Sequence, residues 1–278
     1  MSEVKEVTGT AFVVAEYRAR ENEEENPLYV DPIVPIFLDE RTKRAADAIS
    51  TGFPAAEKLP RLRTRYFDDR LDEQLALGCP QVVILGAGLD TRAVRKCSEG
   101  VTYFEIDDAS TLSLKQARYA ANGIEVEAIF IPGDYVAAGV VPLLDSNGFD
   151  RDLPAFFIWE GNTMYLTRAA VMKVLGELKA RLPKFSISFD YMDEAVVARA
   201  TGELQTSAFV ERFAAMGAPW HFGINDLEGL ADKAAMIVAD VVTVAELHRT
   251  FWPDRPLDSI VYDHYSLCTL KPRAAAKA

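Results

Sequence analysis

"QVVILGAGLDTR" (residues 81–92) places a strand-forming apolar run directly before a turn that contains two glycines. In a doubly wound α/β sheet, the turn after the first strand lies at the crevice where ligands bind. Gly86 and Gly88 have no Cβ, so the backbone can come close to a bound molecule. A dinucleotide-binding turn would carry a third glycine where this chain has Thr91. The stretch therefore predicts a nucleoside site of another kind.

Acidic residues near this turn indicate the charge of the ligand. Asp90 would repel a pyrophosphate but would suit an ammonium group. Asp107 ends "TYFEID" (102–107) and follows the first glycine by 21 residues, close to the spacing at which an acid binds ribose hydroxyls. Asp134 and Glu160 follow two further predicted strands at the same sheet edge. A nucleoside with a cationic amino-acid tail and no phosphate fits this pattern, and S-adenosylmethionine is such a ligand.

Alternating strand-like and helical segments predict a mostly parallel sheet with helices on both faces. The predicted strands are 81–85, 102–107, 127–132, 155–160, 185–191 and 263–270. The predicted helices are 8–21, 38–49, 63–78, 112–122 and 167–182. Residues 192–262 are too many for an ordinary connection between two strands. They are predicted to form a lid-like insertion over the ligand site.

These segments divide the chain into three parts. We expect a helical N-terminal cap at residues 1–78 and a Rossmann-like cofactor-binding domain at 79–272, with its insertion at about 192–262. Residues 273–278 are predicted to be a disordered tail. Within the cap, the acidic stretch "ENEEEN" (21–26) is predicted to be a solvated loop.

Composition narrows the classes of partner. The 278 residues carry a net charge of −12, which disfavours nucleic acid or an anionic membrane as the main partner and favours a small molecule. No apolar run approaches the roughly 20 residues that a membrane helix needs. The N-terminus lacks the pattern of a secretory signal, so we expect a cytoplasmic protein. The cysteines and histidines show no metal-ligand spacing, and no metal site is predicted.

Several motifs resemble those of a known family. "LGAGLDTR" (85–92) followed by "WEGNTMYL" (159–166) is specific to the leucine carboxyl methyltransferase-like family, which includes protein phosphatase methyltransferases and many bacterial small-molecule and polyketide O-methyltransferases. The other matching motifs are "RARE" (18–21), "NPLYVDP" (26–32), "RTRYFDD" (63–69), "YFEIDD" (103–108), "IPGDY" (131–135), "SFDYM" (188–192) and "PWHFGI" (219–224). Together the resemblance covers about residues 8–225.

The resemblance implies a class I methyltransferase fold, in which a seven-stranded Rossmann-like α/β sheet carries an N-terminal helical cap. It also implies S-adenosylmethionine as the cofactor. The implied cofactor contacts are Gly86, Ala87 and Gly88 at the methionine part, Asp107 at the ribose, Asp134 and Tyr135 at the adenine, and Glu160 near the ammonium. An arginine of "RTRYFDD" would bind the cofactor carboxylate, and Arg65 is favoured over Arg63.

One departure from the family concerns the acceptor. Relatives often carry Ser-Lys-Thr-Ala where this chain has Thr8-Gly9-Thr10-Ala11, so either Arg18 replaces the missing lysine or the acceptor differs. The residues predicted to wall an aromatic or acyl acceptor are Tyr17, Arg18, Tyr165, Tyr191 and Trp220. A carboxylate acceptor needs no base, whereas a phenol would profit from one. The candidates for that base are His221, Tyr191, His264 and Tyr265, and none is assigned as catalytic.

The predicted activity is S-adenosylmethionine-dependent O-methyl transfer to a carboxylate or hydroxyl of a small, secondary-metabolite-like molecule. One alternative is methylation of a protein C-terminal carboxylate. Another is a noncatalytic regulatory module that binds the cofactor. A nicotinamide-dependent oxidoreductase is disfavoured by Thr91 and by the lack of a proton relay centred on Tyr/Lys or His.

Overall fold

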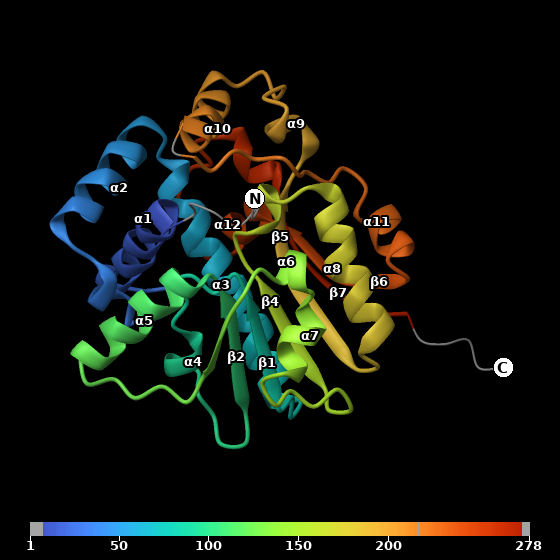
Figure 1. The fold of residues 1–278 in the computed structure, drawn as a ribbon. Coiled ribbons are helices and arrows are strands. Elements are labelled where there is room, and N and C mark those ends of the chain that lie inside the picture. Colours follow the sequence, from blue (N-terminus) through green and yellow to red (C-terminus); the bar gives the residue numbers. More distant parts are fainter. Residues whose placement is uncertain (1–7, 216, 274–278) are drawn as a thin grey trace.

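The computed structural model describes residues 8–215 and 217–273, which contain one seven-stranded sheet (Figure 1). The strands are β1 (Gln81–Leu85), β2 (Thr102–Asp107), β3 (Ile129–Pro132), β4 (Ala155–Trp159), β5 (Phe185–Met192), β6 (Met236–Thr243) and β7 (Tyr265–Pro272). Their order is β3-β2-β1-β4-β5-β7-β6. Pairing is parallel from β3 to β5, and β7 runs antiparallel to both of its neighbours. The predicted mostly parallel α/β sheet is confirmed.

Helices precede, connect and cover these strands. The N-terminal helices are α1 (Thr8–Arg20), α2 (Glu40–Gly52) and α3 (Ala55–Ala76). The helices between the parallel strands are α4 (Arg92–Arg95), α5 (Ala109–Ala121), α6 (Tyr135–Ala138), α7 (Val140–Asp145) and α8 (Arg168–Arg181). After β5 come α9 (Glu194–Val197), α10 (Leu204–Ala215), α11 (Leu227–Lys233) and α12 (Val244–Phe251). The short 3₁₀ helices are η1 (Glu21–Glu23), η2 (Val34–Phe37), η3 (Thr163–Tyr165) and η4 (Ile260–Asp263).

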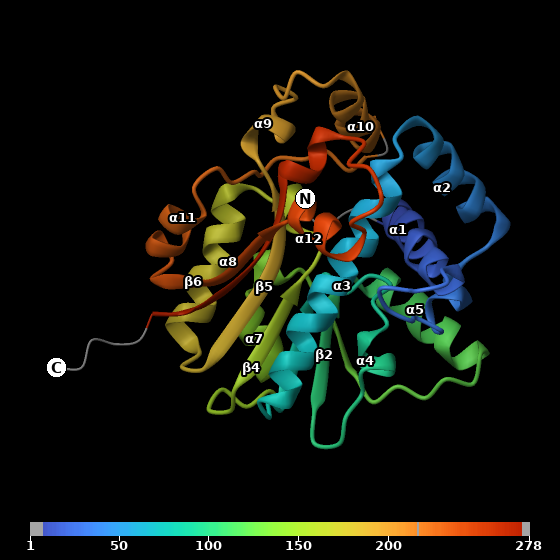
Figure 2. The ribbon, with the colours of Figure 1, turned by 180° about the vertical axis from the view of Figure 1, so that it is seen from behind.

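Both faces of the central strands are buried. On β1, Val83 packs into one hydrophobic core with Phe157 of β4, while Val82 packs into another with Phe156. Helices α7 and α8 cover the first face, and α3 and α12 cover the second (Figures 1 and 2). This double burial explains why the central strands read as continuous apolar runs in the sequence.

The carboxyl ends of the central strands lie beneath two helical layers. In the cap, α1 packs against both α2 and α3. Helices α9 and α10 lie over the same edge of the sheet from the other side (Figures 1 and 2). The cap and the segment after β5 therefore enclose the edge where a doubly wound sheet binds its ligands.

The segment 192–262 is only partly the insertion that we expected. Its residues Met236–Thr243 form β6, which extends the sheet beyond β7. Thr243 then starts α12 through a reciprocal capping box with Glu246. The covering role over the sheet edge falls to α9, α10 and the loop that follows them.

Two other expectations about the cap are corrected. Glu21 of "ENEEEN" is fully buried, because it accepts hydrogen bonds from Arg61 Nε (2.5 Å) and from the Leu28 backbone (2.5 Å). The predicted helix 63–78 begins at Ala55 and continues through Pro60. Helix α3 is therefore longer at its N-terminal end than the sequence pattern indicated, and the acidic stretch begins with a buried residue.

Parts of the predicted N-terminal cap and C-terminal tail are not among the residues that the structure describes. Residues 1–7 of the cap and 274–278 of the tail are outside the described residues. Arg273, which we had assigned to the tail, donates a backbone hydrogen bond to Ala235 (3.2 Å). Within 8–215 and 217–273, no helix has the length and the apolar character needed to span a bilayer.

Candidate active site

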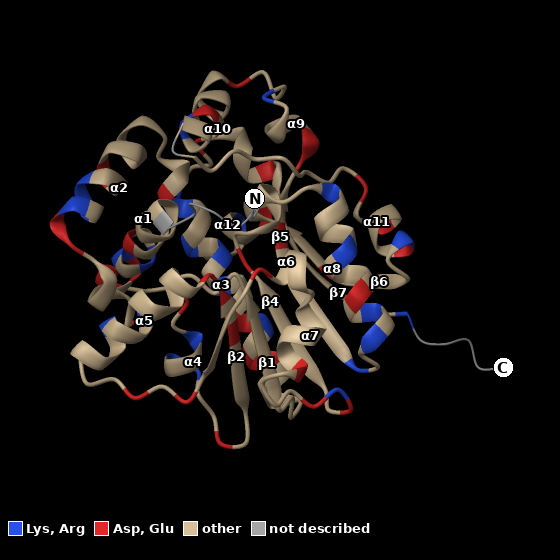
Figure 3. Ribbon diagram, viewed as in Figure 1, with Lys and Arg blue, Asp and Glu red and all other residues tan. Residues whose placement is uncertain are grey.

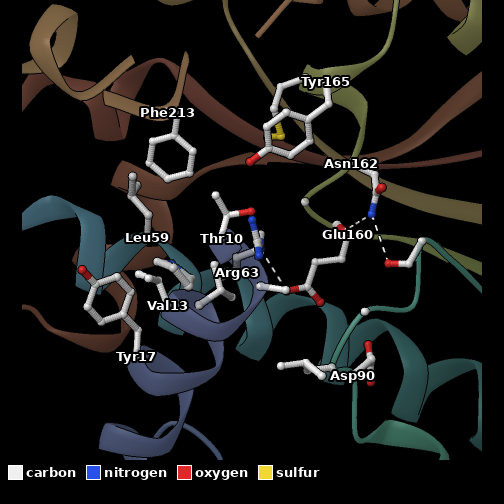
Figure 4. A pocket seen from close by; sticks show the side chains of 18 of the residues that line it. Thr10, Val13, Tyr17, Leu59, Arg63, Asp90, Glu160, Asn162, Tyr165 and Phe213 are labelled. Atoms are coloured by element: carbon white, nitrogen blue, oxygen red, sulfur yellow. Dashed lines mark hydrogen bonds and ion pairs between the residues drawn. The ribbon is translucent and has the colours of Figure 1, made fainter. Parts of the chain in front are cut away.

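A cavity lies between the cap, the carboxyl edge of the sheet and α10 (Figure 4). The cavity has a volume of about 160 Å³. On the same measure, one water molecule needs roughly 10–15 Å³. The walls of the cavity come from α1, α3, the turn after β1, the ends of β2, β4 and β5, and α10. The cavity is therefore large enough for an organic ligand.

The predicted glycine turn forms one wall of this cavity. Gly86, Ala87 and Gly88 all line it, and the two glycines have φ values of +65° and +46°. Asn162, which follows β4, donates hydrogen bonds to the Gly86 carbonyl (3.2 Å) and the Glu160 carbonyl (2.9 Å). A Cβ on Gly86 would lie 2.4 Å from the side chain of Asn162. Glycine is thus needed here for both its conformation and its close contact.

We expect Gly86→Ala to destabilise the protein more than Gly88→Ala does. Both variants impose a left-handed backbone on alanine, at a cost of about 1–2 kcal/mol. Only the Gly86 variant meets Asn162, since a Cβ on Gly88 has no neighbour closer than 3.9 Å. The overpacking should add at least about 1 kcal/mol. Chemical denaturation of the two variants measures the difference, and equal stabilities would contradict the contact.

Asp107 stands at the end of β2 and lines the cavity beside the turn. Its carboxylate accepts hydrogen bonds from the backbone N–H groups of Gly88 (2.6 Å) and Asp108 (2.7 Å). Burial raises its pKa to about 6, although these hydrogen bonds act in the opposite direction. Each carboxylate oxygen has a second acceptor site, so Asp107 can fix the turn and still accept hydrogen bonds from a ligand.

Buried arginines form ion pairs with Asp90 and Glu160, two of the four carboxylates of the predicted acidic rim. Arg92, almost fully buried, pairs with Asp68 (2.7 Å), Asp90 (2.5 Å) and Glu160 (2.7 Å). Burial opposes ionisation of Glu160, but the charges of Arg92 and Arg63 outweigh it and lower the pKa of that carboxyl. Figure 3 shows acidic and basic segments together around α3 and α4. The rim is thus an ion-pair network rather than a row of free carboxylates.

Arg63 connects this network to three strand ends. Its guanidinium donates to Glu160 after β4 (2.9 Å), to Asp190 of β5 (3.3 Å) and to the Tyr265 hydroxyl of β7 (2.8 Å). Tyr265 in turn donates to Asp190. Figure 4 shows the pairing of Arg63 with Glu160 inside the cavity. A helix of the cap therefore reaches the centre of the sheet edge through one side chain.

The complete network contains one more carboxylate than arginines. Among the described residues, its ion pairs join four arginines to five carboxylates. The arginines are 18, 63, 92 and 95, and the carboxylates are those of Asp31, Asp68, Asp90, Glu160 and Asp190. With Asp107 nearby, the site electrostatically favours a ligand of net positive charge.

The family model of leucine carboxyl methyltransferase matches residues 11–179, more than half of the chain. The chain belongs to the leucine carboxyl methyltransferase family. A relative from Streptomyces avermitilis, named as an S-adenosyl-L-methionine-dependent methyltransferase, is 31% identical over 234 residues, which are 77% of this chain and 74% of the relative. A Streptomyces coelicolor relative with the same kind of name shows the same identity and coverage. The predictions of the family and of an S-adenosylmethionine-dependent methyltransferase are confirmed.

Solved structures extend the likeness of this family member to its fold. The crystal structure of a Thermobifida fusca protein described as a methyltransferase has a TM-score of 0.65 at 14% identity, over 95% of this chain and 94% of that one. A Streptomyces avermitilis protein of the duf574 family has a TM-score of 0.63 at 14% identity, over 93% and 97% of the two chains. The predicted class I methyltransferase fold is confirmed.

The cavity of this methyltransferase suits S-adenosylmethionine. The turn from Gly86 to Gly88 exposes backbone without side chains, so a ligand can lie against it. Asp107 has acceptor capacity for ribose hydroxyls at the tip of the next strand. The surplus carboxylate of the network complements a cofactor whose sulfonium and ammonium outnumber its carboxylate.

The structure brings Arg63, not the favoured Arg65, to the cavity. Arg63 lines the cavity, whereas Arg65 lies outside it, donates to Asp69 (2.8 Å) and the Leu28 carbonyl (2.8 Å), and stacks on Phe251. Two residues along a helix correspond to a rotation of about 200°, so both arginines cannot face the same space. This geometry favours Arg63 over Arg65 as the arginine nearest a ligand in the cavity.

Asp134 and Tyr135, expected at the adenine, are not among the residues that line the cavity. Asp134 caps α6 by accepting hydrogen bonds from the N–H groups of Val136 and Ala137 (both 3.0 Å). Tyr135 is buried in the core on the far face of the sheet, where its hydroxyl accepts a hydrogen bond from Trp159 (3.0 Å). Within the protein, Asp134 therefore caps a helix and Tyr135 packs in the core.

Four of the five predicted acceptor residues line the cavity: Tyr17, Arg18, Tyr165 and Trp220. Arg18, however, is already engaged, because it donates to the Leu89 carbonyl (3.0 Å) and to Thr91 (2.9 Å) and pairs with Asp31. It fixes the cap to the glycine turn and does not present a free charge to an acceptor. Figure 4 shows the Tyr165 hydroxyl pointing toward Thr10.

Tyr191 is absent from the described cavity lining, because adjacent strand residues point to opposite faces. Its neighbour Met192 lines the cavity instead, while Tyr191 packs into the opposite core. His221 also lies outside the lining, with an exposed side chain, and His264 pairs with Asp193 (2.9 Å). Of the candidate bases, Tyr265 alone lines the cavity.

Sequence reasoning missed several residues that the structure brings to the site. Asn162 and Asp190 hold the glycine turn and Arg63, and Phe209 and Phe213 of α10 face the cavity. Asn162 follows Glu160 within the family motif, so the motif itself could have pointed to it. The i and i+4 spacing of the two phenylalanines indicated a helix. It did not indicate which part of the protein that helix contacts.

Proposed function

We propose that this family member transfers the methyl group of S-adenosylmethionine to an oxygen atom of a small molecule. The observation that supports this most directly is a single cavity with two chemically distinct halves. One half is ionic and has the glycine turn as its wall, and the other half is apolar. The first suits the cofactor, and the second suits an organic acceptor placed beside it.

Individual residues have distinct roles in this proposal. The backbone at Gly86 to Gly88 and the carboxylate of Asp107 would hold the nucleoside. Arg63 would bind the cofactor carboxylate through Nη2, which takes no part in its contacts with Glu160, Asp190 and Tyr265. Glu160 would lie near the ammonium. When bound, the cofactor supplies an electrophilic methyl group attached to a positively charged sulfur.

The chain contributes mainly orientation and exclusion of water. Helices α1, α3 and α10 form walls of the apolar half, so the acceptor oxygen would be held in line with the methyl group and partly shielded from water. Holding two reactants in such a geometry is worth several powers of ten in rate.

Transfer of a radiolabelled methyl group from S-adenosylmethionine to a metabolite extract tests the proposal. Label should appear in a small molecule with wild-type protein and be much reduced with Asp107→Ala. Release of labelled methanol by mild base indicates an ester, whereas retained label indicates an ether. Label in a protein C-terminus would support the alternative of protein carboxyl methylation, and cofactor binding without any transfer would support a noncatalytic module.

The affinity for the demethylated cofactor, S-adenosylhomocysteine, is expected to fall roughly tenfold from pH 7 to pH 5. The pKa of Asp107 is about 6, so its carboxylate is mostly ionised at pH 7 and mostly protonated at pH 5. A protonated carboxyl accepts ribose hydrogen bonds more weakly. Calorimetric titration at several pH values measures this dependence.

Asp107→Asn is the control for this pH dependence and should abolish it. If the dependence persists in the variant, another group causes it. Glu105, whose pKa burial raises to about 7 against the charge of Lys115, would then be the first candidate.

A further inference from the structure

The apolar half of the cavity has walls from three separate parts of the chain. We define it as the acceptor chamber, formed by Val13, Val14, Leu59, Phe209, Phe213 and Trp220. Val13 and Val14 come from α1, Leu59 from α3, and the aromatic residues from α10 and the loop after it. Figure 4 shows Val13, Leu59 and Phe213 around one side of the cavity, away from Asp90 and Glu160.

The aromatic wall of the chamber is a packed cluster. The ring centroids of Phe209 and Phe213 are 4.7 Å apart, and those of Phe213 and Trp220 are 5.6 Å apart. Phe53 of the α2–α3 connection supports Phe209 from behind at 4.5 Å. Rings held in this way offer fixed flat surfaces, on which an aromatic ligand gains dispersion and offset-stacking energy.

The charged side chains that line the described cavity all belong to the cofactor half. They are Arg18, Arg63, Asp90, Asp107, Asp108 and Glu160. Both arginines are already paired, Arg18 with Asp31 and Arg63 with Glu160 and Asp190. Uncharged polar groups also lie at the chamber. The Tyr17 hydroxyl is engaged, since it donates to the Ala46 carbonyl (2.9 Å), whereas the buried Trp220 Nε1–H has no hydrogen-bond partner among the described residues.

These observations set the charge that an acceptor can carry. A charged group placed in the chamber would lose its water and find no opposite charge. Burial of an unpaired charge is among the most unfavourable events in a protein interior. An apolar body, in contrast, would gain from burial against the aliphatic and aromatic walls.

We propose that the acceptor has an apolar, ring-containing body with no charge outside the oxygen group that is methylated. This inference rests on the proposed function, because it takes the ligand of the chamber to be the methyl acceptor. It selects against charged metabolites and against polar peptide C-termini as acceptors.

Matched ring ligands test the inference on wild-type protein saturated with S-adenosylhomocysteine. 2-Naphthol and 6-hydroxynaphthalene-2-sulfonate share one ring system and differ by one sulfonate. Calorimetry should show at least about tenfold tighter binding of 2-naphthol, because the sulfonate cannot be paired in the chamber. Equal affinities, tighter binding of the sulfonate, or no binding of 2-naphthol would overturn the inference.

Variants locate the binding to the chamber. Phe213→Ala should weaken 2-naphthol binding at least about fivefold through loss of its stacking surface. Phe251→Ala is the matched control, since Phe251 of α12 does not line the described cavity, and it should leave the affinity unchanged. An equal effect of the two substitutions would contradict the proposed location.

A charge introduced into the chamber provides a second, opposite readout. Val14 is half-buried, so a lysine there can be accommodated at the chamber wall. Val14→Lys should reduce the preference for 2-naphthol over the sulfonate at least about fivefold, whereas Val14→Met should preserve it. A folded Val14→Lys protein with the wild-type preference would overturn the inference.

The same titrations separate this inference from the proposed function. If S-adenosylhomocysteine itself fails to bind, the proposed function is wrong. The preference between the two naphthols can still be measured on the protein without cofactor, and it decides the chemistry of the chamber independently.

Discussion

Arg63→Met is expected to lower the free energy of unfolding by about 3–5 kcal/mol, the usual cost of breaking a buried ion pair from one side. The substitution leaves Asp190 buried without its arginine and removes a hydrogen-bond donor from Tyr265. It should also weaken S-adenosylhomocysteine binding at least about tenfold through loss of a charge-assisted contact to the cofactor carboxylate. Denaturation and calorimetry measure the two effects.

Arg65→Met is the matched control from the same helix. Arg65 makes a half-exposed ion pair with Asp69, so its loss should cost less than about 1 kcal/mol, with unchanged cofactor affinity. Arg63→Lys distinguishes positioning from charge, because lysine retains the charge without the planar fork of donors. A larger loss of affinity in the Arg65 variant than in the Arg63 variant would restore the interpretation that we rejected.

Asp107→Ala is expected to weaken cofactor binding at least about tenfold. Each hydrogen bond to its charged carboxylate is worth roughly 1.5–3 kcal/mol. The variant also frees the Gly88 N–H that Asp107 holds, so the turn loses a support on its cavity side. Calorimetry with S-adenosylhomocysteine measures the affinity, and a value equal to that of the wild type would exclude Asp107 from cofactor binding.

Asp134→Ala provides the comparison at a neighbouring strand end. Removal of the cap of α6 should destabilise the protein by about 0.5–2 kcal/mol. Because Asp134 does not line the described cavity, cofactor affinity should change by less than about threefold. A loss comparable to that of Asp107→Ala would return Asp134 to the cofactor site.

The sequence predicted the elements whose burial is strong and local. β1 and β2 have the predicted bounds, because their apolar runs end sharply at the glycine turn and at Asp107. β6 was missed because it is an edge strand with an irregular register between Val238 and Asp240, and its burial varies along its length. The capping box that follows it, Thr243 with Glu246, was a signal that could have marked its end.

The sequence predicted the site residues whose position is set by a backbone motif. It predicted less well which face of a helix or strand a side chain occupies. Gly86, Asp107 and Glu160 reach the cavity because strand ends at one sheet edge converge. Tyr191 and Arg65 lie outside the cavity lining, because a shift of one strand residue or two helix residues reverses the direction of a side chain. The neutralisation of Glu160 by Arg92 depends on a contact across 68 residues, which no local pattern reveals.

The contacts of Arg63 restrict which substitutions this fold can tolerate. Its guanidinium joins side chains that follow or belong to β4, β5 and β7, so loss of any one partner leaves a buried charge or donor unmatched. We therefore expect single replacements within this set to destabilise the protein. In an alignment of related chains, Arg63, Glu160, Asp190 and Tyr265 should therefore covary as one unit, and lineages that abandon the set should replace all four with apolar residues.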